Sequence, residues 1–277
     1  MLNSFFIENH VKKALEEDIG FGDITTDYLT NESDILKCEL NSRTEGIFCG
    51  KNVFEMVFKV LSPKVEVKFY KNDGDVIKKG DKIADIKGPA RYVLMGERTA
   101  LNYVQRMSGI ATETNKYQKA IGEFSAKIVD TRKTTPLFRA FEKYSVKTGG
   151  GSLHRFNLSD CAMIKDNHIK YAGSLTKAVE KLRKDISHAH KIEVECDTVE
   201  QVKEAVACGA DIIMLDNMDL DTMRKCVEII NHKAIVEASG NVNLLTVHDI
   251  ASTGVDIISS SAIVAKAPTL DLGLDCK

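Results

Sequence analysis

The stretch of sequence that decides the fold runs from residue 192 to residue 216 and reads IEVECDTVEQVKEAVACGADIIMLD. Two short apolar segments, residues 192–196 and 211–215, flank a segment with helical spacing at 198–208. Continuous apolar strands joined by helices are typical of parallel sheets whose two faces are both covered. This stretch therefore predicts one β–α–β unit.

The same alternation repeats on both sides of this unit. The predicted strands are residues 127–130, 161–164, 192–196, 211–215, 234–238 and 255–259, with helical segments between them. The last four strands begin roughly 20 residues apart, which is the length of one β–α repeat. Six strands are too few for a complete eight-stranded barrel. We predict an incomplete (β/α) barrel, and a doubly wound open sheet is the alternative.

The first part of the chain has a different pattern. Residues 5–18, 53–61 and 96–123 have helical spacing, whereas residues 35–49 and 65–70 read as strands. This part mixes a small sheet with helices. No low-complexity linker separates it from the repeats, and the predicted boundary lies near residue 108.

Composition excludes several classes of protein. The 277 residues include 38 Lys and Arg against 40 Asp and Glu, a formal net charge of −2. A uniformly basic nucleic-acid binder and an acidic disordered chain are therefore both disfavoured. No apolar run approaches the roughly 18 residues of a membrane span, and no signal peptide is visible. We expect a cytoplasmic protein with neither nucleic-acid nor membrane partners.

The seven cysteines are odd in number and include no Cys-x-x-Cys pair. This pattern favours reduced thiols in a cytosolic protein and disfavours a structural zinc site. A nucleophilic thiol at Cys161 or Cys196 is an alternative.

Polar side chains follow all six predicted strands. In a parallel β–α array, functional groups gather at the carboxyl ends of the strands. Turn chemistry also favours Asp, Asn, Ser and Gly at such positions, but it explains Arg, Lys and Glu less well. The strand-end segments are Asp130-Thr131-Arg132-Lys133, Lys165-Asp166-Asn167-His168, Glu195-Cys196-Asp197, Asp216-Asn217, Ser239-Gly240-Asn241 and Ser259-Ser260-Ser261.

Charge is segregated among these strand ends. Residues 131–168 contain seven Lys and Arg against three acidic residues, a net charge of +4. Residues 193–221 contain nine acidic residues against Lys203, a net charge of −8. Arg and Lys bind carboxylate and phosphate oxygens, and one or two carboxylates recruit Mg²⁺ that phosphates already hold. The pattern predicts an anionic substrate carrying a divalent metal.

Three features leave alternatives open. Lys165 follows an apolar strand and is also suited to Schiff-base chemistry in a lyase. The Gly149-Gly150-Gly151 run is either a ligand-binding loop or a plain flexible turn. The loops after the last two strands commonly bind phosphate in (β/α) barrels, so a phosphate-bearing substrate is the leading prediction.

The chain resembles the quinolinate phosphoribosyltransferase family, also called carboxylating nicotinate-nucleotide pyrophosphorylases, nearly from end to end. The matching motifs, which follow one another in the same order, are Glu17-Asp18-Ile19-Gly20, Gly22-Asp23-Ile24-Thr25-Thr26, Glu97-Arg98-Thr99-Ala100-Leu101-Asn102, Ser108-Gly109-Ile110-Ala111-Thr112, Asp130-Thr131-Arg132-Lys133-Thr134-Thr135-Pro136, Glu142-Lys143-Tyr144, His154-Arg155, Ile164-Lys165-Asp166-Asn167-His168, Glu193-Val194-Glu195-Cys196, Leu215-Asp216-Asn217-Met218 and Glu237-Ala238-Ser239-Gly240-Asn241.

The resemblance implies an α/β protein with a small N-terminal α/β (α+β) sandwich domain, residues 1–108, followed by an incomplete (β/α) barrel, residues 109–265. The C-terminal tail, residues 266–277, would pack with the first domain. It also implies a homodimer in which Arg98 of one subunit reaches the site of the other.

The resemblance further implies a role for each site residue. Arg132, His154, Arg155 and Lys165 would hold the two carboxylates of quinolinate, and Thr131 lies beside them in the motif. Lys133 and Lys165 would face phosphoribosyl pyrophosphate, while Glu195 and Asp216 would bind its ribose hydroxyls or its Mg²⁺. The catalytic residues would be Lys133, Lys165, Glu195 and Asp216. The 5′-phosphate cradle would comprise Ser239, Gly240, Asn241, Ser260, Ser261 and Ala262.

The implied enzyme is a pentosyltransferase of NAD biosynthesis. It would make nicotinate mononucleotide, pyrophosphate and CO₂, with Mg²⁺ and no organic cofactor. Ser261 stands where the family usually has Gly, which puts the detail of the cradle in question. Two rivals remain besides the lyase: a non-carboxylating phosphoribosyltransferase acting on nicotinate or another small acid, and a non-catalytic phosphosugar-binding protein.

Overall fold

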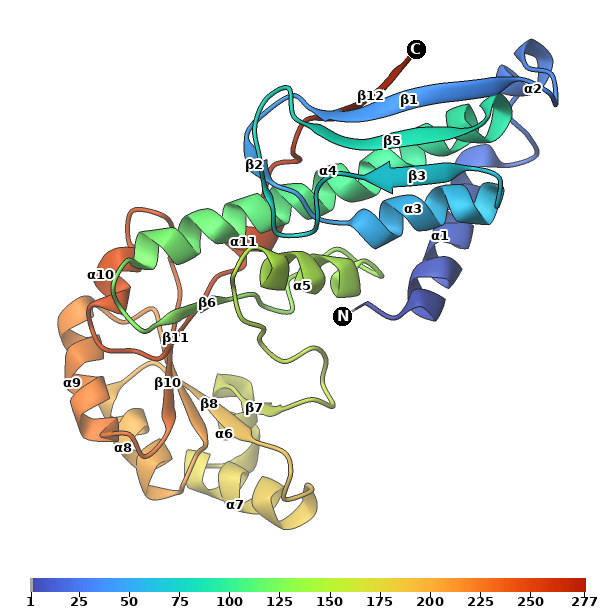
Figure 1. Cartoon of the computed structure of the whole chain (residues 1–277). Helices are drawn as coiled ribbons and strands as arrows, with labels where there is room; N and C mark the ends of the chain where they lie inside the picture. The colour runs from blue at the N-terminus through green and yellow to red at the C-terminus, as the bar shows by residue number, and fades with distance from the viewer. Residues whose placement is uncertain (1) are drawn as a thin grey trace. The chain divides into compact units, whose positions relative to one another are not determined.

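The computed structural model describes residues 2–277 and divides the chain into two compact units (Figure 1). Unit 1 comprises the described residues up to Asn115, together with Pro136–Gly150 and Ala267–Lys277. Unit 2 comprises Lys116–Thr135 and Gly151–Lys266. The predicted boundary at residue 108 falls within helix α4 (Ala90–Ile121), which begins in unit 1 and ends in unit 2.

Unit 1 is built on a four-stranded antiparallel sheet. Its strand order is β12 (Leu272–Cys276), β1 (Ile35–Ser42), β5 (Lys82–Pro89) and β3 (Glu66–Phe69). Helix α1 (Ser4–Ile19) packs against α3 (Lys51–Leu61). One apolar core joins residues of the sheet, these two helices and α4. The smaller elements of the unit are α2 (Thr26–Leu29), β2 (Gly46–Ile47) and β4 (Val76–Ile77).

Residues 136–150 belong to unit 1, although the sequence division assigns them to the barrel. Their helix is α5 (Arg139–Thr148). Phe141 is fully buried, and its ring lies 4.7 Å from the ring of His10 and 5.4 Å from that of Tyr103, centroid to centroid. Tyr144 donates a 2.7 Å hydrogen bond to Asp73. These aromatic contacts place α5 in unit 1, and its sequence alone does not reveal them.

Unit 2 contains the predicted parallel sheet. The strand order is β6 (Lys127–Val129), β11 (Ile257–Ser259), β10 (Ile235–Ser239), β9 (Ile212–Asp216), β8 (Ile192–Cys196) and β7 (Ala162–Ile164). The helices between them are α6 (Asp166–Ala172), α7 (Leu175–Asp185), α8 (Val199–Ala207), α9 (Leu220–Ile230), α10 (Val247–Ala251) and α11 (Ala262–Ala265). Figure 1 shows α8 and α9 outside the strands. The incomplete (β/α) barrel is thus confirmed.

The six strands follow from continuous apolar sequence. In β9, for example, Ile213, Met214 and Leu215 are all buried because both faces of the strand are covered. The helices begin at regular caps: Thr198 and Gln201 form a capping box at α8, and Asp219 accepts a hydrogen bond from Thr222 N at α9. These local signals explain why the predicted bounds of the β–α units agree closely with the structure.

Helix α6 and strand β12 are among the elements that the sequence patterns do not predict. Helix α6 buries none of its side chains, so it has no apolar stripe that would reveal it. Strand β12 is short, and it exists because it pairs with β1 more than 200 residues earlier, Ser42 opposite Leu272.

The expectation that the cysteines are all reduced is wrong. Cys38 and Cys276 form a disulfide between β1 and β12. The two residues lie directly opposite each other in the antiparallel pairing, a relationship that their separation of 238 residues conceals. The other five cysteines are free.

None of the helices formed by residues 2–277 combines the length and the apolar composition that a bilayer-spanning helix needs.

Candidate active site

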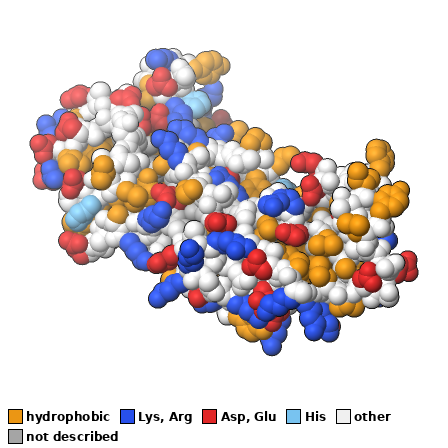
Figure 2. Space-filling model, turned by 90° about the horizontal axis from the view of Figure 1, so that it is seen from above, with side chains coloured by type: hydrophobic (Ala, Val, Ile, Leu, Met, Phe, Trp, Pro, Cys, Tyr) orange, Lys and Arg blue, Asp and Glu red, His pale blue; other side chains and the backbone are white. Residues whose placement is uncertain are grey.

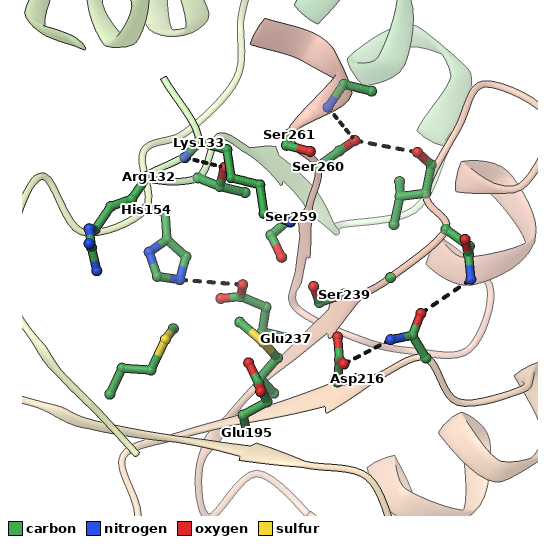
Figure 3. Close-up of a pocket in the computed structure, with 18 of the residues that line it drawn as sticks. Arg132, Lys133, His154, Glu195, Asp216, Glu237, Ser239, Ser259, Ser260 and Ser261 are labelled. Carbon is green, nitrogen blue, oxygen red and sulfur yellow. Dashed lines mark hydrogen bonds and ion pairs between the residues drawn. The ribbon is translucent and has the colours of Figure 1, made fainter. Parts of the chain in front are cut away.

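A cavity of about 710 Å³ in unit 2 lies at the carboxyl ends of the barrel strands (Figure 3). Every strand of the parallel sheet, or the loop that follows it, contributes to its wall. The residues that line it are Thr131, Arg132, Lys133, His154, Arg155, Met163, Lys165, Glu195, Met214, Asp216, Asn217, Glu237, Ser239, Gly240, Asn241, Val242, Ser259, Ser260, Ser261, Ala262 and Lys266. The structure therefore brings together every predicted site residue except Arg98.

The segment after β6 supplies Thr131, Arg132 and Lys133. Thr131 Oγ1 accepts a 3.0 Å hydrogen bond from Lys133 N, which closes a tight turn at the strand end. Figure 3 draws Arg132 and Lys133 on one side of the cavity and Asp216 on the other. Two cations on one short turn form an anion-binding wall.

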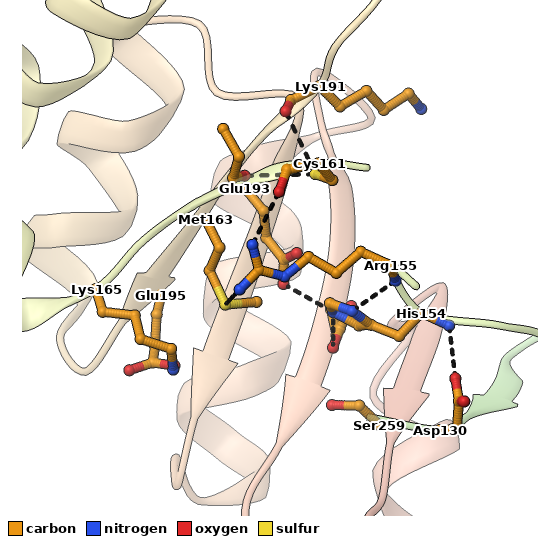
Figure 4. Close-up of polar contacts among 12 residues, drawn as sticks. Asp130, His154, Arg155, Cys161, Met163, Lys165, Lys191, Glu193, Glu195 and Ser259 are labelled. Atoms are coloured by element: carbon orange, nitrogen blue, oxygen red, sulfur yellow. Dashed lines mark hydrogen bonds and ion pairs between the residues drawn. The ribbon is translucent and has the colours of Figure 1, made fainter. Parts of the chain in front are cut away.

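The ends of the neighbouring strands β8 and β9 supply Glu195 and Asp216. Glu195 forms an ion pair with Lys165, which follows β7 (Figure 4). Asp216 accepts a 2.8 Å hydrogen bond from the side-chain amide of Asn217. Two carboxylates that converge on one cavity offer the hard oxygen ligands that Mg²⁺ prefers, so this donor set fits the metal.

The loop after β10 contains a turn that only glycine permits. Gly240 has φ +95°, and a Cβ atom there would lie 2.2 Å from Asn217 Oδ1. The next residue, Asn241, has φ +52° and donates a 3.2 Å hydrogen bond from Nδ2 to the same Asn217 oxygen. The missing Cβ of Gly240 thus leaves room for Asn217, and Ser239, Gly240 and Asn241 line the cavity.

The loop after β11 contributes three further residues of the predicted cradle. Ser260 Oγ accepts a 3.2 Å hydrogen bond from Ala262 N. Ser261 has φ −74°, a conformation open to any residue, so the replacement of the usual Gly by Ser261 causes no backbone strain.

His154 and Arg155 enter the cavity from the segment that follows Gly151. Ser152 forms a parallel bridge with Val129, and His154 N donates a 2.9 Å hydrogen bond to Asp130 Oδ1. The Arg155 guanidinium donates to Cys161 O at 2.9 Å (Figure 4).

Both ring nitrogens of His154 have partners within the protein. Nε2 lies 3.3 Å from Glu193 Oε1 and 3.4 Å from Glu237 Oε1, and Nδ1 accepts a 2.8 Å hydrogen bond from Arg155 N. Burial lowers the pKa of His154, whereas the two neighbouring glutamates raise it. A charged ring would carry a proton on both nitrogens. The Arg155 N–H excludes a proton on Nδ1, because a ring nitrogen that accepts a hydrogen bond carries no proton. We therefore assign a neutral ring with its proton on Nε2.

Two thiols near the strand ends are not activated. Burial raises the pKa of Cys161 to about 11 and that of Cys196 to about 12. A catalytic cysteine needs a lowered pKa, so neither thiol suits nucleophilic catalysis.

Arg98 is an exposed residue of α4 in unit 1 and does not line the cavity. Conversely, sequence reasoning missed several lining residues. Lys266 follows the short helix α11 and carries no local signal. Glu237 did carry a local sequence signal, because a carboxylate inside an otherwise apolar strand is unusual.

Comparisons with known proteins identify the relatives of this chain. The sequence models of the quinolinate phosphoribosyl transferase N-terminal and C-terminal domains match residues 23–108 and 110–275. The chain is 42% identical over 275 residues to the probable nicotinate-nucleotide pyrophosphorylase [carboxylating] of Bacillus subtilis, covering 99% of this chain and 92% of that protein.

Solved structures agree with the sequence matches. NadC from Streptococcus pyogenes has a TM-score of 0.96 at 38% identity, covering 100% of this chain and 99% of the other. The nicotinate-nucleotide pyrophosphorylase from Francisella tularensis has a TM-score of 0.96 at 36% identity, covering 100% and 98%. With both domains matched in order over nearly the whole chain, the protein belongs to the quinolinate phosphoribosyltransferase family.

Proposed function

We propose that this chain transfers the phosphoribosyl group of phosphoribosyl pyrophosphate to quinolinate and releases CO₂, which yields nicotinate mononucleotide and pyrophosphate. One observation carries the proposal: Arg132, Lys133, Arg155 and Lys165 line the same cavity as Glu195 and Asp216. A dianionic acid and a metal-bound pyrophosphate are the pair of ligands that such a division of charge accommodates.

Quinolinate would bind at the cationic part of the cavity. Arg132 and Arg155 present planar guanidinium groups, which bind carboxylates through two parallel hydrogen bonds. Lys165 is a flexible cation whose side chain is 44% exposed, so it can reach an incoming carboxylate. Three cations for two carboxylates favour a diacid over nicotinate, which has one.

Phosphoribosyl pyrophosphate would bind between Lys133, the two strand-end carboxylates and the loops after β10 and β11. Glu195 and Asp216 are the residues that would hold Mg²⁺, which when bound neutralises pyrophosphate charge. Gly240 and Ser260 would contact the 5′-phosphate, since both line the cavity at the ends of β10 and β11.

The reaction depends more on the positioning of the two substrates than on acid–base catalysis. The ring nitrogen attacks C1 of the ribose as pyrophosphate departs, and the sugar gains oxocarbenium character, which the Glu195 and Asp216 carboxylates stabilise. Lys133 and Lys165 stabilise the charge of the departing group. Loss of the adjacent carboxylate as CO₂ then becomes feasible, because the electron pair left on the ring carbon lies beside the positive nitrogen. That electron pair then takes a proton from water, which completes nicotinate mononucleotide.

One assay tests this proposal against its rivals. The protein is incubated with phosphoribosyl pyrophosphate, Mg²⁺ and either quinolinate or nicotinate, and pyrophosphate and CO₂ are followed. We expect both products with quinolinate only. Pyrophosphate without CO₂ would indicate the non-carboxylating enzyme, and no turnover with either acid would indicate a binding protein.

We also propose a homodimer in which Arg98 completes the partner's site. Large hydrophobic side chains of unit 1 are exposed, and hydrophobic atoms stand out on the surface in Figure 2. The exposed hydrophobic side chains of unit 1 include Phe21, Ile24, Tyr28 and Leu29. Such exposure in one region of a chain is typical of a protein interface.

Subunit mixing tests the dimer. Arg98→Ala and Lys165→Ala are each expected to be inactive alone, because each removes a cation from every site. Re-equilibrated equal mixtures should recover about a quarter of wild-type activity, since half of the dimers are mixed and each has one intact site. A mixture without activity would reject the shared site.

We propose the cytoplasm as the compartment, on the ground that five of the seven cysteines are free. The Cys38–Cys276 disulfide is the feature that an oxidising compartment would favour. Cell fractionation with an antibody against the chain decides between them.

A further inference from the structure

The interior of the barrel contains two buried glutamates that the proposed reaction does not use directly. Glu193 on β8 and Glu237 on β10 are 1% and 2% exposed, and the His154 side chain is 9% exposed. Branched apolar residues normally fill the interior of a parallel barrel. Because an unpaired buried carboxylate is costly, both glutamates need a hydrogen-bond donor.

His154 forms a hydrogen bond with Glu193, and Glu237 Oε1 lies near the same ring nitrogen. His154 Nε2 lies 3.3 Å from Glu193 Oε1 and 3.4 Å from Glu237 Oε1 (Figures 3 and 4). The backbone also fixes the residue, through the hydrogen bond from His154 N to Asp130 Oδ1. The ring is thus held from the strands on one side and from its own segment on the other.

The hydrogen bond from Arg155 N to His154 Nδ1 distinguishes a hydrogen-bonded cluster from a metal site. With Nδ1 accepting, the ring proton is on Nε2 and points toward the carboxylates. The three side chains lie close enough together to hold a metal ion. A ligating histidine, however, coordinates through a bare nitrogen and donates its other N–H to the protein, which is the reverse of this arrangement. The cluster is therefore a positioning device and not a metal site.

We propose that Glu193 and Glu237 are positioning residues that hold the His154 ring, and with it the adjoining Arg155, in the orientation that receives quinolinate. The inference rests on the proposed function, since it takes quinolinate as the ligand of this part of the cavity. Arg155 depends on the same short segment: its guanidinium reaches Cys161 O at 2.9 Å and Met163 Sδ at 3.5 Å. Without its contacts to the glutamates, the His154 ring could move, and the adjoining Arg155 side chain could move with it.

Substrate-resolved kinetics test the role of the two glutamates. Glu237→Gln and Glu193→Gln keep the size of the side chain and one acceptor oxygen but lose the charge. We expect the KM for quinolinate to rise about tenfold, and the KM for phosphoribosyl pyrophosphate to stay within about twofold. Glu237→Ala should be worse than Glu237→Gln. Equal rises in both KM values would mean general damage to the cavity and would overturn the proposal.

Glu204→Gln is the matched control. Glu204 also holds protein groups, accepting 2.9 and 2.7 Å hydrogen bonds from Thr176 N and Oγ1, and it does not line the cavity. It should leave both KM values unchanged.

A double-mutant cycle tests whether Glu237 acts through His154. In a His154→Ala background, Glu237→Gln should change the KM for quinolinate no further, because the group it positions is gone. Additive effects of the two substitutions would show that Glu237 acts independently and would contradict the proposal.

A measurement on the wild-type protein keeps the inference testable even if the glutamate variants fail to fold. In ¹⁵N-histidine-labelled protein, the His154 signals are assigned by their loss in His154→Gln. We expect a protonated Nε2 and a bare Nδ1, and no loss of the Nε2 proton when Zn²⁺ is added. The opposite tautomer, or loss of the Nε2 proton on addition of Zn²⁺, would overturn the cluster. Because this spectrum needs no turnover, failure of the cluster is distinguishable from absence of activity with quinolinate.

Discussion

The ammonium group of Lys165 is ion-paired with the carboxylate of Glu195 across the ends of the adjacent strands β7 and β8. In the free protein each side chain therefore neutralises the other, and Glu195 is only 18% exposed. Under the proposed function, an anionic substrate would offer Lys165 a new partner and so free the Glu195 carboxylate to face the ribose or the metal.

Replacing Lys165 should strongly reduce turnover. We expect Lys165→Met to lower kcat about 100- to 1000-fold, because it removes a cation that stabilises developing negative charge. Steady-state release of pyrophosphate measures the effect. Lys170→Met is the control, since Lys170 is an exposed residue of α6 paired with Asp166. If borohydride traps a covalent substrate adduct on Lys165, the lyase hypothesis is correct instead.

Arg132→Ala should abolish quinolinate binding and leave phosphoribosyl pyrophosphate binding intact. The guanidinium group is the proposed carboxylate clamp after β6, whereas the proposed phosphate-facing groups other than Lys133 follow other strands. Isothermal titration calorimetry with each substrate separates the two effects. Arg224→Ala removes an exposed arginine paired with Asp221 and should change neither affinity. Unchanged quinolinate affinity in Arg132→Ala would count against this assignment.

Removing both strand-end carboxylates should weaken the Mg²⁺ dependence of turnover. The Glu195→Ala/Asp216→Ala double variant lacks the two oxygen donors that converge on the cavity. We expect its residual activity to respond less steeply to Mg²⁺ concentration than that of wild type. Asp221→Ala serves as a control, because its side chain is 95% exposed on α9. A double variant with the wild-type metal requirement would reject the metal role.

Reducing the Cys38–Cys276 disulfide should destabilise unit 1. The bond closes a loop of nearly the whole chain, so its loss is expected to cost about 2–4 kcal/mol of unfolding free energy. Urea unfolding with and without dithiothreitol measures this. Cys276→Ser should match the reduced wild type and no longer respond to the reductant. Cys208→Ser, which removes a free thiol, should retain the wild-type response; equal stability with and without reductant would contradict the prediction.

Local sequence was sufficient for the barrel strands and most of the candidate site. Residues 192–216 contain an apolar strand, a capped helix and a second apolar strand, and each is stabilised by near neighbours in the chain. Lys165, Glu195 and Asp216 were predictable for the same reason. Each directly follows a strand, and parallel strands bring their carboxyl ends to one edge.

What the sequence by itself determined was therefore the β–α repeat, the family and the side chains at the strand ends. Tertiary structure alone decided the features that join distant segments. Cys38 meets Cys276 because β12 pairs with β1, and His154 meets Glu193 and Glu237 because the segment after Gly151 pairs with β6. The physical reason is that short-range patterns report only the periodicity and caps of one element. A buried carboxylate or a cysteine finds its partner through packing between elements, and no local spacing records that partner.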